Sequence, residues 1–296
     1  IYMSLKKNII FTVDVEALKH RATDNHVEKL IYGKSNNKYY GINTMMDIGD
    51  MFNFKFDFFV DIYIKKQYGE QIFSKLLSYI DSRNHNIEIH AHPFNESDIN
   101  NAPCLNTYTK KESDILKNVI IQSSILDYNP TAFRGGGFRF NKNILDCLNK
   151  LDIKVDTSLC KGYQINKSLS KWLPKEYKEF KWNNNIIELP VTYLEGNEIF
   201  NENRFSNIKK LCDSIDKCKS NNIIIIFHSW SFFKKIDSNW KIEDCAPDIE
   251  TIVNIKKFIS YVITNKKYNI TTIREAYNDM SSNINTIIPT ENILIN

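Results

Sequence analysis

Two acidic residues, Asp14 and Glu16, closely follow an apolar run at residues 8–11. That run is rich in β-branched and aromatic residues and predicts a short buried strand. Residues two apart on a strand point to the same side, so both carboxylates are expected at one strand end. Two neighbouring acids there are costly unless a cation lies between them, and a metal ion is the commonest cation. The alternative is an acidic strand end that faces water.

A second pair of candidate ligands, His90 and His92, ends the predicted strand at residues 87–92. The two histidines are also two apart and share one face of the strand. Two histidines and one carboxylate bind divalent metals and leave positions open for water and substrate. We therefore expect Glu16, His90 and His92 to bind a divalent ion, with zinc the first choice. The alternative is that one histidine is a hydrogen-bonded core residue.

Three further predicted strands end in residues suited to catalysis: Arg134 with the glycines at 135–137, Asp156, and His228. In parallel α/β folds the reactive groups lie where the strands end, so these residues are expected to meet Asp14. Each has a structural alternative. Arg134 can pair with a structural acid, the glycines can form a tight turn, and Asp156 can cap a loop. His228 follows four isoleucines and a phenylalanine, so it is the hardest to explain as packing.

The elements that position these residues alternate between strand and helix. Strands are predicted at 8–11, 56–60, 87–92, 130–134, 153–156, 186–191, 223–227 and 270–273, and helices at 41–52, 68–82, 109–128, 141–151, 208–220 and 249–263. This alternation, with continuous apolar strands, predicts a parallel sheet covered on both faces. We expect an α/β fold: one (β/α) barrel, distorted or seven-stranded. Residues 1–280 are expected to form a single domain, residues 281–296 a peripheral tail, and residues 17–40 a lid or binding loop.

The composition is that of a soluble globular protein, and a net charge of +4 is too small to predict nucleic-acid or membrane binding. No stretch approaches the roughly 20 apolar residues of a membrane span, and the first residues lack the apolar run of a signal peptide. The six cysteines form no CxxC pair, which argues against a cysteine zinc site. We expect a reduced, cytoplasmic protein.

The chain resembles the polysaccharide deacetylase (NodB-homology) family at five successive motifs. They are TVDVE at 12–16, HAHP at 90–93, FRGGGF at 133–138, DTS at 156–158 and IFHSW at 226–230. The resemblance spans roughly residues 8–275 and is greatest to deacetylase-like proteins of surface-polysaccharide gene clusters. It implies a NodB-like barrel and a single catalytic domain over residues 1–280.

The resemblance also implies roles on the metal side of the site. Asp14 would be the general base that activates a metal-bound water. Glu16 would bind the metal, in the place usually held by aspartate, and His90 matches the first metal histidine.

For the remaining motifs, the resemblance implies that His228 is the general acid that protonates the leaving amine. Arg134 would orient Asp14, and Asp156 would tune His228. Backbone N–H groups of the turn after Arg134 could stabilise an oxyanion, and Gly137 is the best match for that role.

Three positions depart from the family pattern. The second metal histidine usually lies four residues after the first, where this chain has Phe94. His92 is the expected substitute, and Glu96 is a weaker candidate. The third motif has Gly136 in place of proline, and the fourth continues to Leu159 in place of tryptophan.

The expected activity is metal-dependent removal of an acetyl group from a sugar in a glycan precursor or polysaccharide. An N-acetyl group is favoured over an O-acetyl group. The alternatives are hydrolysis of a non-sugar linear or cyclic amide, and a catalytically inactive sugar-binding homologue. The tryptophans Trp172, Trp182, Trp230 and Trp240 suit stacking against sugar rings, or else pack the late loops onto the body. No nucleic-acid partner is expected.

Overall fold

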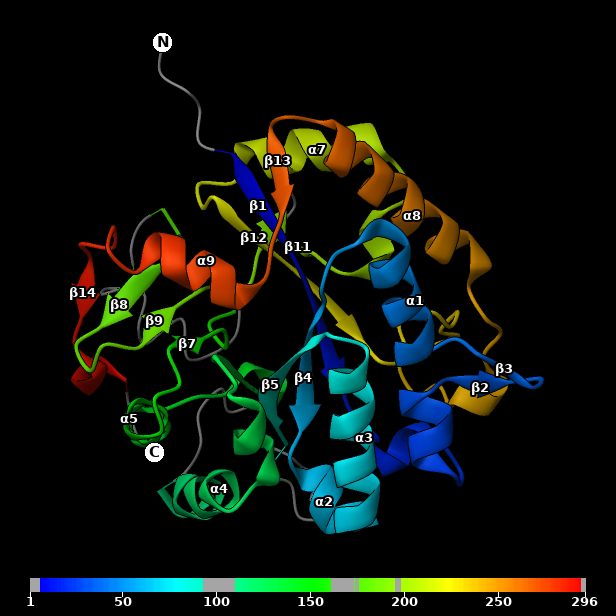
Figure 1. Ribbon diagram of the computed structural model, residues 1–296, viewed down its shortest axis with the longest axis horizontal. Helices are drawn as coiled ribbons and strands as arrows, with labels where there is room; N and C mark the ends of the chain where they lie inside the picture. The colour runs from blue at the N-terminus through cyan, green and yellow to red at the C-terminus, as the bar shows by residue number, and fades with distance from the viewer. Residues whose placement is uncertain (1–5, 93–109, 161–172, 174–175, 195–197, 294–296) are drawn as a thin grey trace.

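The centre of the molecule is a curled sheet, seen in the computed structural model of residues 6–92, 110–160, 173, 176–194 and 198–293 (Figure 1). Its parallel part runs in the order β12 (Asn222–His228), β1 (Lys7–Val15), β4 (Asp57–Asp61), β5 (Asn86–Ala91), β6 (Ala132–Gly135), β7 (Val155–Asp156) and β9 (Ile187–Glu188). β8 (Phe180–Trp182) continues the sheet antiparallel to β9, and β14 (Ile287–Ile288) pairs with β8. β13 (Tyr268–Ile270) pairs with the first residues of β1.

Helices cover the outer face of this sheet, as Figure 1 shows for α1, α3 and α8. They are α1 (Ile42–Phe52), α2 (Tyr63–Tyr68), α3 (Glu70–Ser82), α4 (Lys110–Ile121), α5 (Lys142–Lys150), α7 (Ile208–Lys217) and α8 (Ile249–Thr264). The buried residues of α9 (Ile273–Met280) pack instead on the inner side of the sheet, with Ile10 and Ile224. Asn141 caps α5 as expected, since its side chain accepts a hydrogen bond from the backbone N–H of Ile144. The predicted strand 270–273 ends early because Thr272 caps α9.

Alternate residues of β1 face two different layers, which is why the strand reads as continuously apolar. Phe11 and Val13 belong to the main core beneath the helices. Ile10 belongs to a smaller cluster with Phe59 and Ile224, inside the curl of the sheet. The sheet is therefore buried on both faces, and the predicted α/β barrel-like fold is confirmed as a curled parallel half-barrel.

The chain after β9 returns beside the free edge of β12. The Thr192 hydroxyl accepts a hydrogen bond from the Ile224 backbone N–H (2.8 Å), and the Phe200 carbonyl accepts one from the Ile226 N–H (2.9 Å). This segment includes the antiparallel pair β10 (Tyr193–Leu194) and β11 (Glu198–Ile199). It brings part of the second edge of the half-barrel toward the first.

Regular structure occurs in two segments for which a loop and a peripheral tail were expected. Residues 17–40 hold the short helices η1 (Lys19–Arg21) and η2 (Val27–Ile31) and the hairpin of β2 (Lys34–Ser35) with β3 (Lys38–Tyr39). In the tail, β14 joins the sheet, and Ile288 and Ile293 are buried in the main core. Across the described residues, no helix combines the length and apolarity needed to cross a bilayer.

Candidate metal centre and active site

Parallel register brings the predicted site residues to one edge of the sheet, toward which the arrows of β1 and β4 point in Figure 1. Asp14 on β1 lies opposite His228 on β12. On the other side, His90 on β5 lies opposite Arg134 on β6. Four strands therefore deliver side chains to the same place, as expected for the carboxyl ends of parallel strands.

Glu16, His90 and His92 converge on one point. A single carboxylate oxygen, Oε1 of Glu16, lies 2.7 Å from Nε2 of His90 and 2.8 Å from Nε2 of His92. Ligand atoms of the three residues all lie within 4.8 Å of one another, and the same holds for Asp14, Glu16 and His228. Two imidazole nitrogens and a carboxylate oxygen are suitable donors for zinc, so the residues present fit a divalent metal.

The charges in this cluster favour a cation. Burial alone would raise the pKa of Glu16, but the adjacent histidines outweigh burial and hold that pKa well below its usual range. Burial lowers the pKa of His90, but the carboxylates of Asp14 and Glu16 outweigh it and raise that pKa to about 9. Buried carboxylates thus attract positive charge to this point, either as protons on histidine or as a metal ion.

Hydrogen bonds fix how the two histidines are presented. Nδ1 of His90 lies 2.8 Å from the Arg134 carbonyl, which can only accept, so Nδ1 carries a proton and donates it. In neutral His90, Nε2 then has its lone pair toward Glu16, as a metal ligand requires. The backbone N–H of His92 donates to Oδ1 of Asp61 (3.3 Å), which also accepts from the Tyr63 N–H (3.0 Å).

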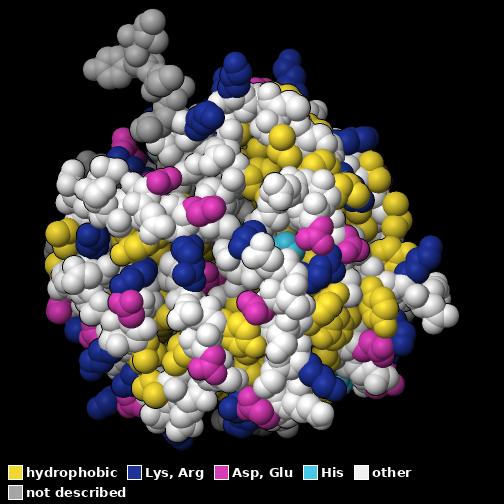
Figure 2. Space-filling model, in the orientation of Figure 1, with side chains coloured by type: hydrophobic (Ala, Val, Ile, Leu, Met, Phe, Trp, Pro, Cys, Tyr) yellow, Lys and Arg dark blue, Asp and Glu magenta, His cyan; other side chains and the backbone are white. Residues whose placement is uncertain are grey.

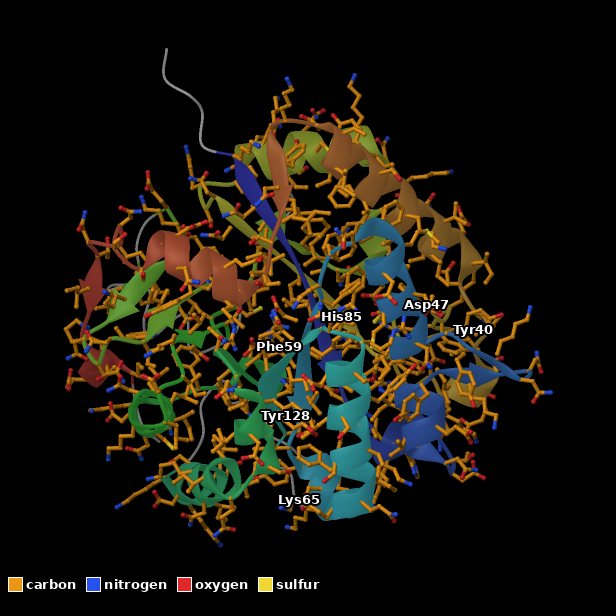
Figure 3. All side chains as sticks on the ribbon, viewed as in Figure 1. Tyr40, Asp47, Phe59, Lys65, His85 and Tyr128 are labelled. Carbon is orange, nitrogen blue, oxygen red and sulfur yellow. The ribbon has the colours of Figure 1, made fainter. Side chains whose placement is uncertain are left out.

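Arg134 holds Asp14 from inside the half-barrel. Its Nη1 donates to Oδ1 of Asp14 (2.6 Å) and to the Thr12 hydroxyl (3.1 Å). The guanidinium carbon lies 4.2 Å from the ring centre of Phe59, which Figure 3 labels near the middle of the molecule. Arg134 is fully buried and Asp14 is 3% exposed, so this ion pair is shielded from water. The structure therefore brings Arg134 and Asp14 into contact, and the orienting role that the resemblance implies for Arg134 stays a prediction.

Comparison with known proteins identifies the fold. No protein-family model matches this sequence, and no curated protein matches it significantly. A protein from Mycobacterium smegmatis assigned as a polysaccharide deacetylase superposes with a TM-score of 0.61 at 14% identity, covering 97% of this chain and 94% of that one. The chain has a NodB-like polysaccharide deacetylase fold.

Two other solved structures share the fold. The allantoinase PuuE superposes with a TM-score of 0.56 at 10% identity, covering 95% of this chain and 93% of that one. The 4-alpha-glucanotransferase from Thermococcus litoralis gives a TM-score of 0.55 at 14% identity, covering 97% of this chain and 42% of that one. One NodB-like fold thus carries different reactions, so function has to be argued from the site.

Asp156 and His228 have other neighbours than the predicted pairing suggests. Oδ1 of Asp156 accepts a hydrogen bond from the Ser158 hydroxyl (2.7 Å), whose oxygen in turn accepts one from the Gly135 N–H (2.9 Å). The His228 ring stacks on Trp230, with centroids 5.1 Å apart and an interplanar angle of 16°. Within the described part of the chain, no hydrogen bond joins Asp156 to His228. Asp156 therefore contacts the turn after β6.

Glu188 is a buried acid that sequence reasoning missed. It lies opposite Asp156 in the strand register, and its carboxylate accepts from the Leu159 N–H (3.0 Å) and Trp182 Nε1 (3.0 Å). Burial, and then the adjacent Asp156 carboxylate, raises the pKa of Glu188 well above its usual range. A protonated Glu188 can donate to Asp156. The sequence feature that could have revealed Glu188 is its position as the one acid inside the otherwise apolar run 186–191.

The turn after β6 uses left-handed backbone at two positions. Gly137 has φ 63°, and Phe138 has φ 57°. Nothing lies within 4 Å of the place where a Cβ of Gly137 would be, so the backbone conformation explains glycine there. The N–H of Gly137 remains a predicted oxyanion donor.

The described tryptophans are buried, so they do not form an exposed aromatic surface at the mouth of the site. Trp182 is fully buried, and Trp230 and Trp240 are 4% and 6% exposed. Trp230 and Trp240 belong to a small cluster with Leu30 from the loop 17–40. Trp172, Phe94 and Glu96 lie outside the described residues.

Tyrosines supply the exposed aromatic surface beside this loop. A groove of about 700 Å³ is lined by Tyr32, Tyr39, Tyr68 and Tyr79 together with Asn43. Figure 2 shows hydrophobic side chains, coloured yellow, in this region to the right of centre. The Tyr68 hydroxyl donates to the carbonyl of Ala17 (2.5 Å), the residue after Glu16. The groove therefore adjoins the loop that leaves the candidate metal centre.

Proposed function

We propose that this protein is a metal-dependent hydrolase that removes an acetyl group, N-acetyl first, from a sugar of a glycan precursor or polysaccharide. The observation that carries the proposal is the convergence of Glu16, His90 and His92 beside the ion-paired Asp14. Residues 1–280 would act as one catalytic domain. The NodB-like fold supports this proposal.

In this proposal Glu16, His90 and His92 hold the ion, and zinc is the expected metal. A bound divalent ion would polarise the acetyl carbonyl and lower the pKa of a coordinated water. Asp14 takes a proton from the attacking water, and Arg134 keeps its carboxylate turned toward that water.

His228 then donates a proton to the departing amine. It lies beside Asp14 in the register but on a different strand, so base and acid can approach the scissile bond from two sides. Trp230, stacked against His228, fixes the plane of the imidazole. The N–H of Gly137 is proposed to stabilise the oxyanion.

A sugar is the proposed substrate because the surface beside the site suits it. Tyrosine rings in the groove offer flat faces with hydroxyl groups at their edges, and Asn43 adds an amide hydrogen-bonded to Tyr79 (2.9 Å). Sugar rings bind to such surfaces through their apolar faces and hydroxyls. The described lining of the groove includes the acidic Glu28 and no lysine or arginine, which disfavours an acidic saccharide.

Acetate release tests the proposal. Zinc-loaded protein is incubated with N-acetylated and O-acetylated oligosaccharides, and Asp14→Asn serves as a nearly isosteric control. Loss of the general base should lower the rate about 100-fold or more. Equal acetate release by the variant and the wild type would refute the assigned role. Hydrolysis of allantoin without acetate release would instead support a non-sugar amide substrate.

A further inference from the structure

Steric constraints require glycine at position 136. A Cβ at this position would lie 2.4 Å from Nδ1 of His92 and 2.5 Å from its Cγ and Cε1. Real Cβ atoms essentially never make contacts below 3.0 Å. Gly136 is not among the residues with positive φ, whereas the next residue, Gly137, has φ 63° and open space around it. The two adjacent glycines therefore serve different purposes.

The His92 ring has little freedom to move aside. Its Nε2 lies 2.8 Å from Oε1 of Glu16, and its plane is nearly perpendicular to the His90 ring, at 76° with centroids 4.9 Å apart. Its backbone N–H donates to Asp61, which fixes the start of the side chain. A ring pushed away from Gly136 would lose its contact with Glu16.

Strand register explains why these two residues meet. Ala91 on β5 pairs with Gly135 on β6, so the next residues along the two parallel strands, His92 and Gly136, are also neighbours. Any residue with a Cβ at position 136, proline included, would direct that atom into the imidazole. Glycine is the one residue type without a Cβ.

We propose that Gly136 is a positioning residue for the metal site, because the missing side chain lets the His92 ring reach the ion held by Glu16 and His90. Two departures from the family pattern, glycine in the third motif and a histidine two residues after the first, are then parts of one structural change. The inference rests on the proposed role of His92 as a metal ligand.

The test is a double-mutant cycle on purified full-length protein. Zinc affinity is measured by competition with a chromogenic chelator, and stability is measured as the denaturation midpoint of the metal-free protein. Gly136→Ala should weaken zinc binding about 10–100-fold, as expected when a partner that orients a ligand is lost. It should also lower the denaturation midpoint.

The same substitution is then made in the His92→Ala background, where the ring is gone. There Gly136→Ala should change neither zinc affinity nor the midpoint, and this double variant keeps the test open if the single variant fails to fold. Gly137→Ala is the matched control, because its backbone strain should lower the midpoint equally with or without the His92 ring.

Three results would overturn the proposal. The first two are unchanged zinc affinity in Gly136→Ala and an equal loss of zinc affinity in both backgrounds. Unchanged zinc affinity in His92→Ala would remove His92 from the ligand set and would overturn the proposal as well. These readouts need no substrate, so they are separate from acetate release, which tests the proposed function.

Discussion

Breaking the buried ion pair between Arg134 and Asp14 should strongly destabilise the protein even without metal. Arg134 is fully buried, Asp14 is 3% exposed, and their closest atoms are 2.6 Å apart. Substituting Arg134→Leu leaves the buried carboxylate without its hydrogen-bonded guanidinium, and removing one partner of a buried ion pair typically costs about 3–5 kcal/mol. We therefore expect the free energy of unfolding to fall by about that amount.

The assay is chemical denaturation in the presence of a chelator, so that no bound metal contributes. Asp14→Asn and the double variant complete a cycle with Arg134→Leu. Because the double variant removes both charges, its loss should be smaller than the sum of the two single losses by about 1–3 kcal/mol. Additivity within about 0.5 kcal/mol would refute an energetically coupled pair.

Three further predictions concern proton uptake, the tail and metal binding. The pKa of Glu188 is raised well above its unfolded value, so native Glu188 retains a proton that the unfolded chain loses. As the pH rises above about 5, the wild type should therefore lose stability relative to Glu188→Gln, by up to about 1.4 kcal/mol per pH unit; parallel profiles would contradict this. Truncation after Met280 removes the buried Ile288 and Ile293 and should lower the free energy of unfolding by about 3–6 kcal/mol. Denaturant titrations measure this loss, and a loss below about 1 kcal/mol would show that the tail contributes little to stability. Zinc at about 100 times its dissociation constant should stabilise the wild type by about 2.7 kcal/mol in thermal melts. The stability of Glu16→Gln should not change on addition of zinc, and equal stabilisation of both proteins would place the ion elsewhere.

The strands and the residues at their ends could be predicted from the sequence because both depend on local patterns. Apolar runs marked the strands, and the polar residue after each run marked its exit. Parallel topology requires these strand ends to meet, so it predicts that Asp14 and His228 lie together, and the register of β1 with β12 pairs them. Which side chains touch within that cluster depends on packing that no single segment encodes.

Contacts across strands account for most of what the sequence did not show. Asp156 lies opposite Glu188 in the sheet, although the two residues are 32 positions apart along the chain. On α3, the helical spacing of Ile72, Leu76 and Ile80 predicts Ile72 on the buried face, but Ile72 is 38% exposed and the neighbouring Phe73 is buried. The register of that helix against the sheet decided between two adjacent apolar residues.

The tail illustrates a second limit of local patterns. Residues 281–296 are mostly polar with isolated isoleucines, a composition typical of a peripheral segment. Its short strand is stable because β8 offers an edge to pair with, and its isoleucines enter a core formed by distant residues. Neither the edge nor the core is encoded within the tail itself.

The most direct test of the metal centre is anomalous diffraction from a crystal soaked in zinc. The account predicts one strong peak about 2.0–2.2 Å from Nε2 of His90, from Nε2 of His92 and from a carboxylate oxygen of Glu16. A fully occupied peak that does not contact these three residues, or no peak at this strand edge at saturating zinc, would contradict it.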